Sequence, residues 1–223
     1  MIKILFVCHG NICRSTMAQS LFTYLVREAG LEQAFCIESA ATSREEIGNP
    51  PHPGTVRQLR REGIPVVPHQ AVQMTKRDYA RYDLLIGMDE ENLYYMRRIA
   101  GGDPDHKICK LMAFAAGPDA PEEPGGAWVS KGVSKQKQAA GSSRARKKGR
   151  SHTALSDKPS AGGSSHTAST GNPNAKNNRE CFMNANRHVP DVADPWYTGD
   201  FAATYRDCLA GCSGLLDWVV QLC

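Results

Sequence analysis

The amino-acid sequence predicts an α/β fold: a doubly wound, four-stranded parallel sheet with helices on both faces. The first observation is a set of short, mainly apolar runs with the length of buried strands, at residues 2–7, 35–39, 82–88 and 107–112. The second is that segments with apolar residues at helical spacing alternate with these runs. Strands that alternate with helices imply a parallel sheet, which binds its ligands at the carboxyl ends of the strands.

The helices predicted between the strands have recognisable ends. The first is expected over residues 15–29 and stops at Gly30, a residue suited to the position after a helix C-cap. Thr75, followed three residues later by Asp78, is a variant of the capping box. Asp89 is expected to cap a further helix that runs to about residue 99. The remaining predicted helices cover residues 53–62 and 201–220.

Composition excludes several classes of protein. The chain has 223 residues and eight cysteines, but it has no C-x2-C pair of the kind that binds zinc. No apolar run approaches the ~18 residues needed to span a membrane. The apolar opening, about six residues long, is too short for a signal peptide and lacks a cleavage site. We therefore expect a cytoplasmic protein with free thiols and no membrane span.

Residues 118–188 differ from the rest of the chain in composition and charge. They are rich in Gly, Ser, Ala, Asn and Lys, and apolar residues are sparse. Residues 125–188 hold twelve Lys/Arg against two Asp/Glu, a net charge of +10, whereas the remaining chain has fifteen against twenty-one, a net of −6. Such a segment buries too little apolar surface to offset the entropy of ordering it. We expect one domain formed by residues 1–117 and 189–223, interrupted by a basic, disordered insertion that could bind an anionic partner weakly.

The segment between the first strand and the first helix carries the chemistry. It reads C-x5-R, from Cys8 to Arg14, and it contains Gly10 and Asn11, residues of the two types that best tolerate positive φ. A tight loop that leads into a helix N-terminus presents a ring of backbone N–H groups suited to a tetrahedral oxyanion. Arg14 adds a planar fork for two phosphate oxygens. The N–H groups and the helix dipole also favour a thiolate at Cys8.

The longer string C-x-G-N-x-C-R-S, directly after a strand, resembles the low-molecular-weight protein tyrosine phosphatases. This family shares its fold with thioredoxin-coupled arsenate reductases and bacterial protein arginine phosphatases. The resemblance covers residues 1–114 and 191–222. The resemblance also depends on four further motifs: S-A-A-T-S (39–43), I-G-N-P-P (47–51), G-M-D-E-E-N (87–92) and D-P-W-Y (194–197). It implies a single catalytic domain with the phosphotyrosine protein phosphatase I-like fold, which hydrolyses phosphotyrosine in protein substrates.

The resemblance also implies roles for individual residues. Cys8 would attack phosphorus to form a phosphocysteine, and Arg14 would bind the phosphate oxygens. Asp194, aimed by the proline that follows it, would act as general acid and then as general base. Ser39 and His69 would support the loop. No metal or cofactor is expected, because the loop and the cationic fork stabilise the phosphate charge. Further residues expected to bind phosphate or substrate are His9, Gly10, Asn11, Ile12, Cys13, Ser15, Glu45, Trp196 and Tyr197.

Two positions depart from the family's pattern. Family members usually have a proline at the position of Thr16, so the helix start is expected to be slightly less rigid here. They often have an aromatic residue at the position of Glu45, where a flat side chain can cover a phenyl ring. A carboxylate disfavours a dianionic ester unless Arg44 or a basic residue of the substrate offsets it. We expect this difference to affect the range of substrates and not the chemistry. Asp89 and Asn92 are expected to be structural.

Cys13 corresponds to a second loop cysteine that, in the family, can form a disulfide with the nucleophile. That disulfide protects the nucleophile from irreversible oxidation. The resemblance therefore implies reversible inactivation by peroxide, which depends on Cys13.

Three alternatives remain open. An arsenate reductase of this fold would have a small polar residue in place of Ile12 and a downstream cysteine relay, whereas Cys109 and Cys181 match no such pattern. An arginine phosphatase would have a threonine in place of Ile12. The chain could also be a non-enzymatic binding module whose basic segment binds nucleic acid or another anionic surface in a salt-dependent way. That segment has almost no aromatic residues for base stacking, which disfavours nucleic acid.

Overall fold

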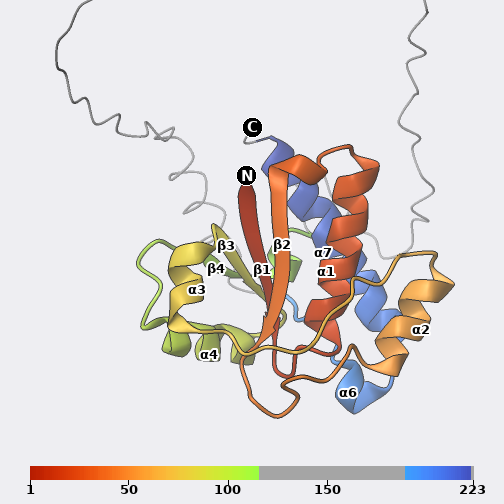
Figure 1. Ribbon diagram of the computed structural model, residues 1–223, viewed down its shortest axis with the longest axis horizontal. Helices are drawn as coiled ribbons and strands as arrows, with labels where there is room; N and C mark the ends of the chain where they lie inside the picture. Colours follow the sequence, from red (N-terminus) through yellow and green to blue (C-terminus); the bar gives the residue numbers. More distant parts are fainter. Residues whose placement is uncertain (116–188, 222–223) are drawn as a thin grey trace, which may run out of the picture. The chain divides into compact units, whose positions relative to one another are not determined.

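The sheet has four parallel strands in the order β2-β1-β3-β4, namely β1 (Ile2–Cys8), β2 (Phe35–Ala41), β3 (Leu84–Gly87) and β4 (Ile108–Lys110) (Figure 1). The computed structural model describes residues 1–115 and 189–221, and all of these residues belong to one α/β unit. β1 is central: it pairs with β2 along its whole length and with β3 on its other side. The predicted four-stranded parallel sheet is confirmed.

Helices α1 (Arg14–Glu28) and α7 (Phe201–Val220) cover one face of the sheet, with α2 (Pro53–Arg61) beside them (Figure 1). A strand buried on both faces directs alternate side chains to opposite sides. Accordingly, Ile4 and Phe6 of β1 pack into the hydrophobic cluster formed with α1 and α7.

Helices α3 (Lys76–Arg81) and α4 (Glu90–Ala100) cover the opposite face (Figure 1). Here Leu5 and Val7, the alternate residues of β1, pack in a second cluster with Leu93 of α4. The predicted capping box at the start of α3 and the Asp89 cap of α4 are both present. Because helices cover both faces, the sheet is doubly wound as predicted.

The C-terminal helix packs directly against elements from the first half of the chain. Gly214 of α7 lies against η2 (Leu111–Ala113), a 3-10 helix that follows β4, and a Cβ added to Gly214 would lie 1.8 Å from the Phe114 carbonyl oxygen. The fully buried Cys208 thiol faces the carbonyl oxygen of Arg14, at the start of α1. These close approaches fix α7, and the segment before it, relative to the first helix.

Three strands and several short helices differ from the sequence prediction; β2 runs to Ala41, two residues further than predicted. β3 and β4 are shorter than residues 82–88 and 107–112; before β4 the Lys107 amide donates to the Asp103 carboxylate, and after it the chain turns into η2. Neither η1 (Glu32–Ala34) nor α6 (Pro195–Thr198) was predicted. Each is about one turn long, which is too short to show a periodic apolar pattern.

The insertion predicted at residues 118–188, with its expected disorder, lies outside the described residues. Within residues 1–115 and 189–221, no helix combines the length and the apolar composition needed to cross a bilayer.

Candidate active site

The loop from β1 to α1 is held by the buried side chain of Asn11, whose backbone adopts the left-handed conformation (φ 57°). Its amide nitrogen donates to the hydroxyls of Ser15 and Ser39, both at 2.9 Å. Its amide oxygen accepts from the Val72 backbone amide at 3.1 Å and from the His69 ring at 2.7 Å. All four hydrogen bonds available to an asparagine side chain are therefore made. They connect the loop to the end of β2 and to the chain around residue 70.

His69 contacts an oxygen that can only accept, so its Nε2 must carry the proton. Burial lowers the pKa of His69 below its usual value, although the negative charge of Glu38 acts in the opposite direction. The neutral ring with Nε2–H satisfies the contact to Asn11. Ser39 is also fixed from behind, because its hydroxyl donates to the Gln19 side chain at 2.7 Å.

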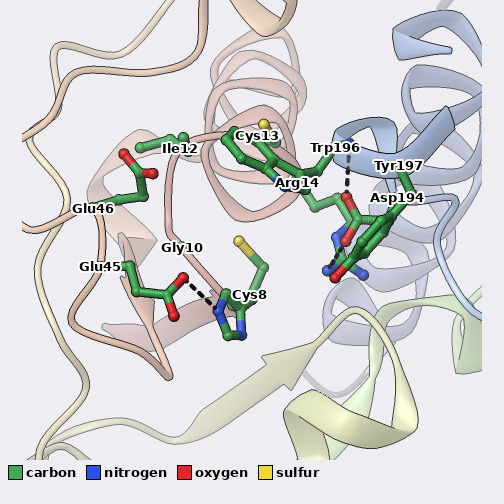
Figure 2. A pocket seen from close by; sticks show the side chains of 11 residues that line it. Cys8, Gly10, Ile12, Cys13, Arg14, Glu45, Glu46, Asp194, Trp196 and Tyr197 are labelled. Carbon is green, nitrogen blue, oxygen red and sulfur yellow. Dashed lines mark hydrogen bonds and ion pairs between the residues drawn. The ribbon is translucent and has the colours of Figure 1, made fainter. Parts of the chain in front are cut away.

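The Cys8 sulfur lies at the floor of the pocket, where β1 ends (Figure 2). It accepts a hydrogen bond from the Asn11 backbone amide at 3.3 Å. The Ser15 hydroxyl is 3.1 Å away and already accepts from Asn11, so its proton can point at the sulfur. Two donors on one sulfur stabilise negative charge there.

Arg14 is almost fully buried and presents its guanidinium to two carboxylates. Nη1 pairs with Asp89 at 2.5 Å and Nη2 pairs with Asp194 at 2.5 Å. Burial alone would lower the pKa of Arg14, but the negative charges of Cys8, Asp194 and Asp89 together raise it. The cation is therefore permanent, and its orientation is set from two sides.

Asp89 makes a second contact that the sequence did not indicate. As predicted, one carboxylate oxygen caps α4 by accepting from the Asn92 amide at 2.6 Å. The other oxygen pairs with Arg14. A local capping pattern gives no sign of this partner 75 residues away, and the structural role expected of Asp89 stays a prediction. Asn92 closes the same turn by accepting from the Met88 amide.

Asp194 stands at the start of α6, where Pro195 opens the helix and the carboxylate accepts from the Trp196 amide at 3.0 Å. The residue before it, Ala193, is held by α7: its amide donates to the Asp207 carboxylate, and its carbonyl accepts from the Thr204 hydroxyl. These hydrogen bonds hold the chain so that the Asp194 carboxylate reaches the guanidinium of Arg14 (Figure 2).

The pocket encloses about 120 Å³ above the Cys8 sulfur. In Figure 2 Glu45 and Glu46 lie on one side of Cys8, and Trp196 and Tyr197 lie on the other. Trp196 and Tyr197 are 61 % and 86 % exposed, so they form a free aromatic edge. The lining residues are Cys8, His9, Gly10, Ile12, Cys13, Arg14, Glu45, Glu46, Asp194, Trp196 and Tyr197.

Most of the expected binding residues line this pocket, but Asn11 and Ser15 do not. Both lie beneath the loop, with Ser39 and His69 as their neighbours. The pocket adds Glu46, which the sequence analysis did not select. Its carboxylate accepts from Asn49 at 2.6 Å, and its stem lies next to Gly10.

The aromatic edge is supported by a ring that sequence reasoning missed. His52 stacks on Phe201, with ring centroids 5.1 Å apart, and meets Trp196 edge-on at 6.2 Å. Its Nδ1 accepts from the Gly54 amide and so caps α2. A histidine between two prolines gives no local signal of such a role.

Cys13 is buried beside the nucleophile, and both cysteines have free thiols. Burial, followed by the charges of Cys8 and Asp194, raises the pKa of Cys13 to about 12, although the Thr55 hydroxyl and Arg14 oppose the shift. Cys13 is consequently a neutral thiol at physiological pH.

Fold and site together define an α/β protein with an oxyanion-binding C-x5-R loop. The family model described as low molecular weight phosphotyrosine protein phosphatase matches residues 3–122. The chain belongs to this family.

Individual relatives agree with this assignment. The low molecular weight protein-tyrosine-phosphatase YfkJ of Bacillus subtilis is 41 % identical over 124 residues, which cover 56 % of this chain and 80 % of YfkJ. A human low molecular weight phosphotyrosine protein phosphatase is 40 % identical over 121 residues, covering 54 % and 74 %. The crystal structure of YfkJ superposes with a TM-score of 0.65 at 28 % identity, covering 99 % of this chain and 96 % of that one. The predicted family and fold are confirmed.

Proposed function

We propose that this chain is an enzyme that hydrolyses phosphotyrosine in protein substrates through a phosphocysteine on Cys8. The observation that carries the proposal is the arrangement in one pocket of a hydrogen-bonded cysteine sulfur, a buried arginine and an aspartate. Membership of the family and the names of YfkJ and the human relative support the same reaction and substrate class.

Substrate binding would begin with an exchange of partners at Arg14. Without substrate, the Nη2 atom pairs with Asp194. A phosphate dianion entering the loop would bind Nη2 and the backbone amides between Cys8 and Arg14, and would release the Asp194 carboxylate to the leaving group's side. Asp89 would stay on Nη1 and keep the guanidinium plane fixed throughout.

Two steps then complete hydrolysis. Once released from Arg14, the Asp194 carboxylate takes up a proton from solvent. The Cys8 sulfur attacks phosphorus, the bond between phosphorus and the tyrosine oxygen breaks, and Asp194 gives its proton to that oxygen. In the second step Asp194 takes a proton from water, the water oxygen attacks phosphorus, and the P–S bond breaks. The Ser15 hydroxyl would stabilise the departing Cys8 thiolate, from which it lies 3.1 Å away.

The rim would select the substrate. Trp196 and Tyr197 offer flat, exposed surfaces for the phenyl ring. Glu45 and Glu46 place negative charge on the opposite side, which favours basic residues next to the phosphotyrosine. We also propose a cytoplasmic location, because a reactive thiolate persists in a reducing compartment. The net charge of +10 in residues 125–188 supports weak, salt-dependent binding of an anionic partner.

Turnover of p-nitrophenyl phosphate and of a phosphotyrosine peptide by the full chain tests the proposal. Cys8→Ser should abolish turnover, and Asp194→Asn should lower it by ~10²–10⁴-fold, the usual contribution of a general acid. Phosphoserine peptide, phosphoarginine and arsenate, assayed in parallel with thioredoxin as reductant, separate the alternatives. Faster turnover of phosphoarginine, or arsenate reduction without phosphatase activity, would overturn the assignment.

A further inference from the structure

Lys110, the last residue of β4, is 9 % exposed and its ammonium has three oxygen partners. It pairs with Glu90 at 2.8 Å and with Asp191 at 3.1 Å, and it donates to the Val189 carbonyl at 2.6 Å. These contacts use all three of its N–H bonds. Burial alone would lower the pKa of Lys110, but the hydrogen bonds to Glu90 and Asp191 raise it, so the side chain stays charged.

Both carboxylate partners are close in sequence to the two carboxylates that hold Arg14. Glu90 follows Asp89, and Asp191 precedes Asp194 by three residues. Arg14 and Lys110 therefore bind the same two segments at different points: the guanidinium at the pocket, the ammonium at the end of β4. Through Lys110, the segment that brings Asp194 is tied to the first turn of α4.

The contacts of Lys110 are made with residues 189 and 191, at the start of the segment that leads to Asp194. β4 ends at Lys110 and the segment of the aspartate begins at residue 189, so 78 residues lie between them in the sequence. Downstream, Val192 donates to the Met88 carbonyl at 2.8 Å, and Ala193 is bonded to α7. Upstream of Val192, Lys110 contacts the Val189 carbonyl and the Asp191 carboxylate. Lys110 therefore ties the start of the segment that carries Asp194 directly to the end of β4.

We propose that Lys110 is a positioning residue for Asp194, which it holds over the leaving group by fixing residues 189–191 to β4 and α4. The inference rests on the proposed general-acid role of Asp194. Lys110 does not touch the substrate, so its loss should weaken proton donation and leave phosphate binding by the loop in place.

The test compares two aryl esters that need the acid to different degrees. Phenyl phosphate has a basic leaving group that must be protonated, whereas p-nitrophenyl phosphate has an activated one. The quantity measured is kcat/KM, because it reports the steps up to departure of the leaving group. In Lys110→Met we expect kcat/KM to fall by about tenfold for phenyl phosphate, part of the ~10²–10⁴-fold that a general acid contributes. For p-nitrophenyl phosphate we expect a fall of about twofold.

Two further variants should give smaller losses than Lys110→Met. Lys110→Arg keeps a cation that can reach Glu90 and Asp191, and should recover most of the phenyl phosphate activity. Asp191→Asn removes one arm of the contact at nearly constant volume, and should give a smaller loss in the same direction. It also provides a test if Lys110→Met does not fold.

Lys107→Met is the matched control. Lys107 lies just before β4, at the opposite end of the strand from Lys110; its side chain is 18 % exposed, and it donates to the Tyr79 carbonyl at 3.0 Å. Its loss should lower stability without changing the ratio of the two esters. Equal losses for both esters in Lys110→Met, or the same change of ratio in Lys107→Met, would overturn the proposal. If Asp194→Asn lowers kcat/KM equally for both esters, Asp194 is not the general acid. That result would contradict the proposed function rather than the role of Lys110.

Discussion

The floor of the pocket, residues 8–15, is held by buried hydrogen bonds, whereas its rim, formed by Glu45, Glu46, Trp196 and Tyr197, is open to solvent. In the floor, the buried side chains of Asn11 and Arg14 each have several partners, and moving one would leave others unsatisfied. In the rim, side chains make few contacts and can change without disturbing their neighbours. The floor therefore determines the reaction and the rim determines which substrates reach it.

The largest effect is expected where the floor depends on one residue. Asn11→Ala removes four hydrogen bonds and leaves a left-handed backbone on alanine. We expect turnover to fall by about 100-fold, the scale of an ångström-sized misplacement. Unfolding free energy should fall by about 3 kcal/mol, because several buried groups lose their partner. Steady-state kinetics and urea unfolding measure both. A fully active variant would show that the loop needs no such support.

Asp89→Asn tests whether the floor extends beyond the loop. The variant keeps an oxygen for the α4 cap but removes the negative charge beside Arg14. We expect kcat/KM to fall by about tenfold, roughly the value of one charged hydrogen bond. Asp78→Asn, at the cap of α3, is the control: it should affect stability alone. Similar kinetics for the two variants would make Asp89 structural only.

The strands, the long helices and the C-x5-R loop could be predicted because each depends on neighbours within a few residues. The pairing of Asp89 with Arg14 and of Lys110 with Asp191 could not, since these partners lie 75 and 81 residues apart and meet only after the sheet has formed. The ring of His52 between Trp196 and Phe201 is of the same kind. The packing that brings residues from the ends of different strands together could not be predicted from the sequence.

Cys13 sharpens the comparison, because its thiol lies in the floor and takes no part in the proposed hydrolysis. Peroxide would oxidise the Cys8 thiolate to a sulfenic acid, and condensation with the Cys13 thiol would release water and form a disulfide. We expect reductant to restore wild-type activity after a peroxide dose that inactivates Cys13→Ser irreversibly. Mass spectrometry of the oxidised protein identifies the bond. Equal recovery in both proteins would contradict the expectation.

At the rim, Glu45→Gln should change the preference between basic and acidic phosphotyrosine peptides by a small factor. Removing this charge should shift the ratio of kcat/KM between basic and acidic phosphotyrosine peptides by about threefold toward acidic ones, as expected for an exposed charge. The shift should diminish at high salt, because exposed charges are screened. An unchanged ratio would assign selection of peptides to other residues.

The smallest expected effect concerns pH. Because burial lowers the pKa of His69 in the folded protein, the unfolded chain binds a proton there more readily. The resulting stability is present above the unfolded pKa of about 6.5 and is lost as the pH falls through the folded value. His69→Gln, which can still donate to Asn11, should show a smaller drop in Tm between pH 7.5 and 5. If Tm drops equally in the wild type and in His69→Gln, His69 does not contribute to the pH dependence of stability.

The close packing of α7 against η2 and the start of α1 has a consequence for how the protein could be divided. The nucleophile and the arginine lie before residue 116, and the aspartate lies after residue 188. A break within the intervening 73 residues would leave two polypeptides, one with Cys8 and Arg14 and the other with Asp194. Their interface would be the one already present, with Gly214 against Phe114 and Cys208 against Arg14. The chain is thus laid out for fragment complementation, in which recovered catalysis would report the reunion of the two pieces.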